Sequence, residues 1–526
     1  MSEVVLHKAG AFVFVCAALL GPALLSPRPA AAAWPSDPNE NVPVCTTAHE
    51  QDYPASVSDG ARGVIVTWVE YRNGSGDIYA QRISADGTVQ WPANGVALCT
   101  AAGNQWNPTI VSDGGAPGEA GSGAVVAWQD QRSSNNDDIY AQRVSASGAA
   151  QWTADGVALC TAAGWQGSLA ITSDGGAPGG AGAGAIVTWD DYRNSNYDIY
   201  AQKIASTGTV QWTVNGVALC TATGGQYYPA IVTDGAGGAV VSWFDQRSGN
   251  YDVYAQRILT GGAVNWAANG VALCTDAGEQ YYPTIVADGA GGAIVAWFDQ
   301  RSGNYDIYAQ KIAANGTVPW TANGVALCTA TGTQWYPAIV PDGVGGAIVT
   351  WTDSRGATCD IYAQRISAGG AAQWTVNGAT LCTATGWQEL GTTVSDGAGG
   401  AIATWVDGRS DNFDIYAQRV LASGLLGGTV DVSDETALAF ALDPVRPNPS
   451  RGGALTVRFT LANGTTASLE LFDVAGRRIA AREVGPLGAG PHALDLGEGQ
   501  HLAPGLYLVC LRQGADTHVT RVAVLR

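Results

Sequence analysis

The side chains best suited to acid–base or metal chemistry lie in two segments that are far apart in the sequence. The first reads His49-Glu50-Gln51-Asp52, and the second contains Glu389. An imidazole beside carboxylates can exchange protons with a substrate or hold a metal ion, provided that the two segments meet in the fold. Irregular residues are also usual at the ends of a repeat array. His49, Glu50 and Glu389 are therefore the only catalytic candidates, and the sequence favours a protein that is not an enzyme.

Aromatic side chains form a second set of candidates, because they recur where each repeated unit of the chain begins. The faces of aromatic rings stack on the C–H faces of sugars, and Arg247 and Arg301 of a neighbouring loop can donate hydrogen bonds to hydroxyl groups. The alternative is that the rings only fill gaps on one face of the fold. We predict a ligand-binding surface made by these two arginines and by Trp106, Tyr227, Tyr228, Tyr281, Tyr282, Trp335 and Tyr336.

A third pattern joins a tryptophan, an acid and an arginine at alternate positions, as in Trp243, Asp245 and Arg247. It occurs seven times. A salt bridge that holds the same loop in every repeat explains it. The alternative is a ring of cation or glycan sites, so the pattern leaves a calcium site open. No Cys and His spacing suggests zinc. We predict no metal and no cofactor.

The elements that must position these residues come from an internal repeat of about 54 residues. Its Asp-Ile/Val-Tyr-Ala-Gln element starts at Asp77, Asp138, Asp198, Asp252, Asp306, Asp360 and Asp414. Each repeat contains four short runs typical of β-strands, separated by Asp-Gly and other turn residues. Four strands at this period are typical of one blade of a β-propeller. The sequence therefore predicts an all-β fold with a seven-bladed β-propeller over residues 34–421.

The two ends of the repeat array are each incomplete, and they complement each other. The seventh unit, at Asp414, lacks the usual Trp and Val-Ala-Leu-Cys run, whereas Trp34 and Val42–Cys45 supply such a run before the first unit. We predict that the start of the mature chain forms the outer strand of the last blade. That strand closes the ring and brings His49 and Glu50 near Glu389, with no exposed sheet edge.

Seven cysteines share one position of the outer strand: Cys45, Cys99, Cys160, Cys220, Cys274, Cys328 and Cys382. Equivalent positions of neighbouring blades lie too far apart for a disulfide, so these residues are expected to be buried free thiols.

Residues 1–33 have the pattern of a signal peptide, with an apolar core from Ala9 to Leu25 and Ala31–Ala33 before the cleavage site. No other stretch is long and apolar enough to cross a membrane. The formal net charge of −19 comes from the repeats, and an acidic surface repels nucleic acid. We expect a protein that is secreted or held on the outer surface of a bacterial cell.

Beyond a linker of residues 422–443, residues 444–526 form a separate domain with six or seven short strand-like runs, as in an Ig-like β-sandwich. Pro447-Asn448-Pro449, Phe472–Arg477 and Leu502–Tyr507 resemble motifs of the C-terminal sorting domain of type IX secretion cargo and of the related Ig-like domain of flagellar hook-capping proteins. This resemblance implies export by the secretion machinery, followed by release or surface anchoring. The chain ends without the lysine pair that is common in the sorting domain.

Together these patterns favour a non-catalytic binding or adhesion module for extracellular glycan or a surface protein. Two alternatives remain. One is a structural or interaction protein of the cell envelope that binds no small ligand, and the other is a polysaccharide-active hydrolase or lyase. A fold of this class serves many functions and does not choose among them.

Overall fold

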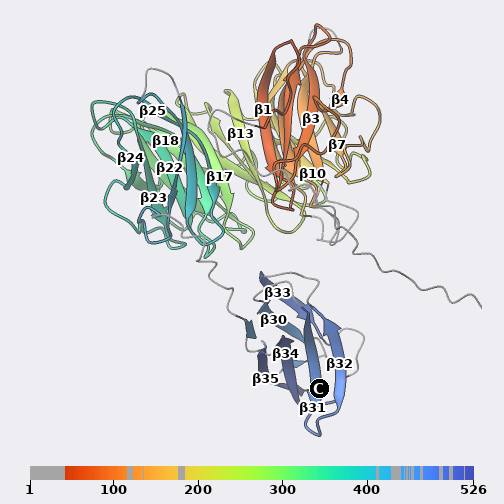
Figure 1. Ribbon diagram of the computed structural model, residues 1–526. Helices are drawn as coiled ribbons and strands as arrows, with labels where there is room; N and C mark the ends of the chain where they lie inside the picture. Colours follow the sequence, from red (N-terminus) through yellow and green to blue (C-terminus); the bar gives the residue numbers. More distant parts are fainter. Residues whose placement is uncertain are drawn as a thin grey trace, which may run out of the picture. The chain divides into compact units, whose positions relative to one another are not determined.

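The computed structural model describes residues 42–114, 123–133, 136–175, 184–409 and 414–427, and most of 440–525. The predicted signal peptide, Trp34 and most of the expected linker lie outside these residues. The chain divides into two compact units, Met1–Leu426 and Gly427–Arg526. The described residues form β-strands, turns and irregular segments without a helix, as the sequence predicted (Figure 1). They accordingly include no helix that could span a membrane.

The described residues of the first unit form seven antiparallel sheets in which the strands follow chain order. Six sheets have four strands, and the last has three. The strands of the first three sheets are β1 (Gln51–Ser58), β2 (Val64–Glu70), β3 (Asp77–Ile83), β4 (Val96–Cys99), β5 (Gln105–Ser112), β6 (Ala124–Asp130), β7 (Asp138–Val144), β8 (Val157–Cys160), β9 (Gln166–Ser173), β10 (Ala185–Asp191), β11 (Asp198–Ile204) and β12 (Val217–Cys220). The other four contain β13 (Gln226–Thr233), β14 (Ala239–Asp245), β15 (Asp252–Ile258), β16 (Val271–Cys274), β17 (Gln280–Ala287), β18 (Ala293–Asp299), β19 (Asp306–Ile312), β20 (Val325–Cys328), β21 (Gln334–Pro341), β22 (Ala347–Asp353), β23 (Asp360–Ile366), β24 (Ala379–Cys382), β25 (Gln388–Ser395), β26 (Ala401–Asp407) and β27 (Asp414–Val420).

The fourth sheet illustrates how the repeat folds. Strands β14 and β15, which are rich in β-branched and aromatic residues, pair without interruption from Ala239↔Ile258 to Asp245↔Asp252. By contrast, β13 has a bulge between Tyr227 and Ala230 in its pairing with β14. Tyr228 lies in this bulge with a φ of 49°, a backbone conformation that is uncommon for a residue other than glycine.

Neighbouring sheets share apolar cores. Trp243 of the fourth sheet is fully buried and packs with Ile199 and Leu219 of the third. The close packing explains the glycine before each fourth strand, since a Cβ atom on Gly270 would lie 2.6 Å from the Trp243 ring. Fully buried tryptophans at the same position fix the spacing between consecutive sheets.

A polar network also joins each sheet to the one before it. Asp245 is fully buried; it accepts a hydrogen bond from Trp243 Nε1 at 2.9 Å and pairs with Arg247 at 2.5 Å. Arg247 Nη2 also donates to Cys220 Sγ of the preceding sheet at 3.1 Å, and the guanidinium lies 3.9 Å from the centre of the Tyr254 ring. The same ion pair and the same arginine–tyrosine contact occur in all seven sheets. This network serves the fold, which was the first of the two roles predicted for the pattern.

The repeated cysteines are free thiols, as expected, and those of the second to sixth positions are buried. Burial raises the pKa of Cys220 to about 12, so its sulfur stays protonated and unreactive at neutral pH. Cys45 and Cys382, at the two ends of the array, are only half-buried.

The closing strand that the sequence predicted is not present among the described residues. The last sheet ends with β27, and Val42–Cys45 has no strand structure. β1 and β25 lie in separate parts of the unit (Figure 1). Ile415 of β27 is 74% exposed, whereas the equivalent Ile361 of the sixth sheet is fully buried in a core that it shares with Trp405 of the seventh sheet. Among the described residues, no following sheet packs on Ile415 in this way.

The second unit contains two sheets on one apolar core. The first is built from β28 (Ala441–Leu442), β30 (Thr456–Leu461) and β33 (Gly490–Asp495), and the second from β29 (Ser450–Arg451), β31 (Ala467–Asp473), β32 (Arg478–Glu483), β34 (Gly505–Gln513) and β35 (Asp516–Leu525). Phe459 of the first sheet and Leu471 and Val509 of the second are buried in this core. The Tyr507 hydroxyl donates to the Ala503 carbonyl at 2.8 Å.

Two motifs of the second unit have clear local roles. The Asn448 side chain bridges to β35, since its Nδ2 donates to Arg521 O and its Oδ1 accepts from Ala523 N, both at 3.0 Å. Asp473 caps the turn between β31 and β32 by accepting from the backbone amides of Ala475 and Arg477.

Candidate functional site

Aromatic rings form a continuous strip across the third to seventh sheets of the first unit. One row contains Tyr197, Tyr227, Tyr251, Tyr281 and Tyr305, with neighbouring ring centres 5.0 to 6.1 Å apart. A second row contains Tyr228, Tyr282 and Tyr336, at 5.1 and 6.1 Å. Phe244 and Phe298 lie between the rows, and Trp165, Trp335 and Trp387 extend the strip at its ends. We call these thirteen residues the aromatic strip.

The bulges in β13, β17 and β21 present six of these rings, two on each strand. Tyr227 and Tyr228 belong to strand β13, the first strand of the fourth sheet. Because of the bulge, both face the same sheet surface instead of alternating between two sides. Tyr228, Tyr282 and Tyr336 are 48%, 40% and 49% exposed, so the second row offers ring faces to a ligand. Rings that only plugged a gap would be covered.

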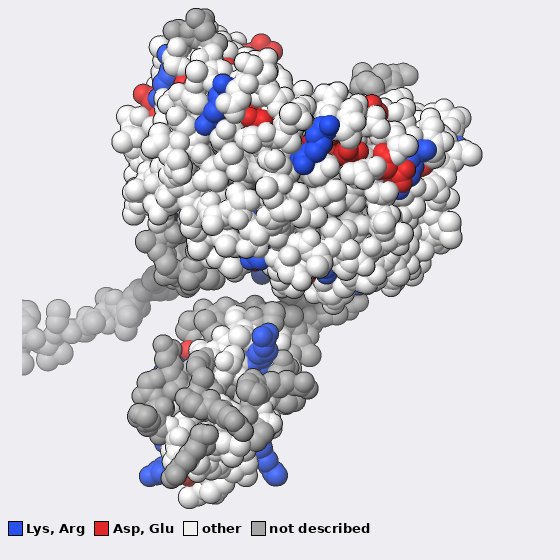
Figure 2. All heavy atoms as spheres, turned by 180° about the vertical axis from the view of Figure 1, so that it is seen from behind, with Lys and Arg blue, Asp and Glu red and all other residues white. Residues whose placement is uncertain are grey.

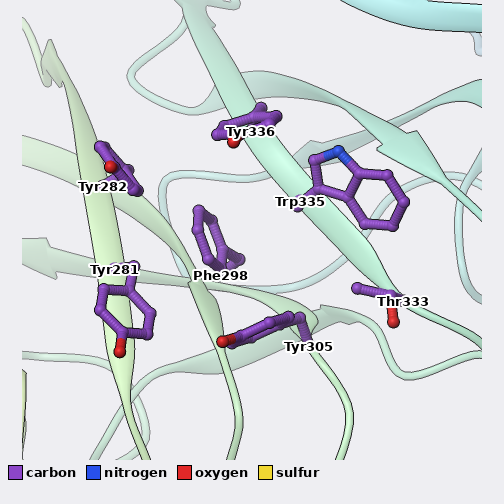
Figure 3. A pocket seen from close by; sticks show the side chains of 7 residues that line it. All are labelled: Tyr281, Tyr282, Phe298, Tyr305, Thr333, Trp335 and Tyr336. Carbon is purple, nitrogen blue, oxygen red and sulfur yellow. The ribbon is translucent and has the colours of Figure 1, made fainter.

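A cavity of about 340 Å³ opens on the strip between the fifth and sixth sheets. Figure 3 shows Tyr281 and Tyr282 on β17 and shows Trp335 and Tyr336 on β21, the first strand of the next sheet. Phe298 lies between the two pairs. Tyr305 and Thr333 complete the lining. Burial and the nearby Glu279 raise the pKa of Tyr281 to about 12, so its hydroxyl remains a hydrogen-bond donor.

A second cavity, of about 510 Å³, adjoins the first and shares Tyr281 and Tyr282 with it. It is lined further by Trp165, Ser168, Asp190, Tyr197, Tyr227, Tyr228, Phe244 and Tyr251. The two cavities thus form one groove along three sheet boundaries, with mostly aromatic walls. Aromatic walls with few polar groups are typical of sites for small organic ligands and sugars.

Asp190 is the one carboxylate in the lining of either cavity. Its side chain is 1% exposed; Oδ2 accepts a hydrogen bond from the Tyr228 amide at 3.3 Å, and Oδ1 has no partner. Burial raises the pKa of Asp190 to about 6, although the Tyr228 amide and the Ser168 hydroxyl act in the opposite direction. The next sheets carry Phe244 and Phe298 at the same position, so the packing of the repeat does not require a carboxylate there.

The remaining predicted site residues lie elsewhere. Arg247 and Arg301 are held in the networks between sheets and line neither cavity. Trp106, in the second sheet, packs at the edge of the core of the first two sheets and also lines neither cavity. Tyr227, Tyr228, Tyr281, Tyr282, Trp335 and Tyr336 are brought together in the groove.

The three catalytic candidates are not brought together. His49 and Glu50 are exposed residues just before β1, and Glu389 lies in β25 in another part of the unit (Figure 1). Glu389 accepts a hydrogen bond from Trp387 Nε1 at 3.3 Å, which places it beside the far end of the aromatic strip. Among the residues that the structure describes, no group of three or more His, Cys, Asp or Glu side chains is arranged to hold a metal ion.

Sequence reasoning missed Asp190, Phe244, Phe298 and the tyrosines that precede the third strand in three of the sheets, Tyr197, Tyr251 and Tyr305. These positions were passed over because they neighbour the invariant tryptophan or the invariant aspartate of the repeat. A comparison of one position across the repeats would have found them, since the residue after the tryptophan changes from Val69 and Gln129 to an acid and then to phenylalanine.

The electrostatic surroundings of the strip are acidic. The ionisable neighbours that shift the pKa values of Tyr197, Tyr227 and Tyr281 are other tyrosines, Asp190 and Glu279, without a lysine or arginine. On the face of the first unit in Figure 2, the charged side chains are few, and blue and red groups mostly lie beside one another. The cations of the repeats are thus neutralised by their own carboxylates.

Comparison with known proteins finds only distant structural matches. No family model and no curated protein matches it. Among solved structures, an ulvan lyase, described as a new family of polysaccharide lyase, matches with a TM-score of 0.44 and 11% identity over 73% of this chain and 96% of that chain. An exo-β-1,3-galactanase from Phanerochaete chrysosporium has a TM-score of 0.29 and 12% identity over 73% and 99%, and an endo-arabinase from Bacteroides thetaiotaomicron has 0.27 and 14% over 44% and 88%. Matches this distant transfer no residue and no activity.

Proposed function

We propose that this chain is an exported, non-catalytic binding protein that holds extracellular glycan on its aromatic strip. The observation that carries the proposal is the row of exposed rings over two adjoining cavities. Sugar rings have apolar C–H faces that stack on aromatic rings, and phenol hydroxyls reach the sugar hydroxyls at the rim. The groove continues across several repeats, so it suits an extended polysaccharide better than a single sugar.

The same proposal includes a closed seven-bladed propeller. Support comes from Cys45, whose Sγ donates to Glu70 at 3.2 Å and accepts from Arg72 at 3.5 Å. Each later cysteine of the series docks on the next sheet in this way, as Cys220 does with Arg247. Cys45 therefore occupies the docking place of a preceding fourth strand, and β27 is the strand that lacks one.

We further propose that residues 1–33 direct export and that residues 444–526 act as an Ig-like sorting or anchoring domain. The bond from Tyr507 to a carbonyl four residues upstream resembles the tyrosine corner of Ig-like sandwiches, which supports this assignment. The proposed location is outside the cell or on its outer surface, with the secretion machinery as a transient partner and no transmembrane segment after cleavage of the signal.

The experiment is a glycan and polysaccharide binding screen on the mature chain, with and without calcium, because we propose that no cofactor is needed. Tyr227→Ala, Tyr281→Ala and Trp335→Ala should each weaken binding at least tenfold. Val376, which is 88% exposed and lines neither cavity, offers the control substitution Val376→Ala. If no glycan binds the unaltered chain, the proposal is wrong, and a protein complex recovered by cross-linking would favour the envelope role.

One observation favours a second candidate function, that of a polysaccharide hydrolase or lyase. A buried carboxyl with a pKa near 6 beside a sugar groove is suited to act as a general acid, and Asp190 has both properties. Turnover of a polysaccharide that disappears in Asp190→Asn, while binding persists, would establish this activity.

A further inference from the structure

Asp190 and its surroundings also define which glycans the strip can accept, provided that the proposed glycan binding holds. We propose that the aromatic strip selects glycans with free amino groups, whose ammonium ions lie against the ring faces near Asp190. Such ligands are polymers or oligomers of amino sugars that are not N-acetylated.

The first step of the argument is the ring geometry. Tyr228, Phe244 and Tyr282 form one wall of the larger cavity, with ring centres 5.1 to 5.7 Å apart. Tyr227 and Tyr251 add two more faces. Several ring faces around one space attract a cation through their quadrupoles, and the attraction increases when water is excluded.

The second step is the unpartnered carboxyl. Asp190 Oδ1 has no hydrogen-bond partner although the side chain is almost fully buried, and buried polar atoms of this kind normally have one. A cation in the cavity above it compensates an ionised Asp190 through a medium of low dielectric constant. The next two sheets have phenylalanine at the position of Asp190. Burying a phenylalanine there would cost the folded state less free energy than burying an unpaired carboxyl group.

The third step is the sign of the remaining charges. No lysine or arginine lines either cavity. Glu279 accepts from the Tyr251 amide at 3.0 Å and lies beside Tyr281, and Glu389 lies beside Trp387 at the end of the strip. A uronic acid or a sulfated sugar would meet carboxylates and no counter-ion, whereas an ammonium group would be attracted along the whole strip.

The test compares three probes on the full mature chain by calorimetry: the hexamer of β-1,4-linked glucosamine, its fully N-acetylated counterpart and a hexamer of galacturonic acid. The glucosamine hexamer should bind at least fivefold more tightly than the acetylated one at low salt, and the galacturonic acid hexamer should not bind. The preference should decrease as salt is added.

Two isosteric variants test whether the preference for amino groups arises at the aromatic strip. Asp190→Asn should reduce the ratio between the amino and acetylated hexamers at least threefold, and Glu279→Gln should reduce it less. Val376→Ala should leave it unchanged. Circular dichroism confirms that each variant is folded.

The outcomes separate this inference from the glycan proposal on which it rests. If the acetylated hexamer binds as tightly as the amino hexamer, or if Asp190→Asn leaves their ratio intact, the preference for amino groups is refuted while glycan binding stands. If neither hexamer binds and Tyr282→Ala changes nothing for any glycan, both proposals are wrong.

Discussion

Replacement of Asp190 by asparagine should stabilise the first unit at neutral pH and leave its stability unchanged in acid. The pKa of Asp190 rises from 3.8 to about 6 on folding, because burial disfavours the ionised form. This difference of about 2 pKa units corresponds to about 3 kcal/mol of unfolding free energy. A raised folded pKa means that this stability is present below about pH 4 and is lost as the pH rises through about 6.

Asparagine has nearly the same shape and no charge, so Asp190→Asn avoids this loss. With an unfolding entropy of about 2 cal/mol/K per residue, a unit of this size should gain roughly 3–4 °C in melting temperature. Differential scanning calorimetry of both proteins at about pH 4 and about pH 8 measures the effect. An equal difference at both pH values, or a less stable variant at the higher pH, would refute the reasoning from burial.

Three further predictions concern the groove, the network between sheets and the ring. Between about pH 4 and about pH 6, where the amino groups of the glucosamine hexamer stay largely protonated, its affinity should rise as Asp190 ionises, and calorimetry of Asp190→Asn should show a flatter profile. Arg247→Ala leaves Asp245 buried without its partner, so urea unfolding should show a loss of about 3 kcal/mol, while glycan affinity of the folded protein is unchanged. In a closed ring Ile415 faces Cys45, as Ile361 faces Cys382, so under oxidising conditions the thiol introduced by Ile415→Cys should form a disulfide with Cys45. Peptide mapping without reductant detects that bond, and its absence argues for an open array.

The repeated part of the fold could be predicted from the sequence because the same residues make the same packing contacts in every unit. Trp243, Asp245 and Arg247 recur at fixed spacing, and the structure shows each in the same contacts in every sheet. Local pairing of neighbouring strands then follows from turn positions alone.

The groove was predictable only in part, because its rings come from three different places in each repeat. Tyr281 was found as an aromatic residue at the start of an inner strand, whereas Phe298 lies near the end of a second strand and Tyr305 just before a third. These rings converge because of the bulge in which Tyr282 has a positive φ. The residue types at this position do not predict a bulge. Asp190 was overlooked because the acid beside it, Asp191, belongs to the repeated pattern.

The identical joint at each sheet boundary makes the repeats interchangeable. Because Arg247 and Arg301 meet the preceding sheet through the same atoms, a duplicated or deleted unit brings its own matching connection with it. Recombination among the nearly identical middle repeats would therefore lengthen or shorten the aromatic strip in whole steps. Gene duplication could thus change the length of polysaccharide that such a protein binds without any change in the contacts between sheets.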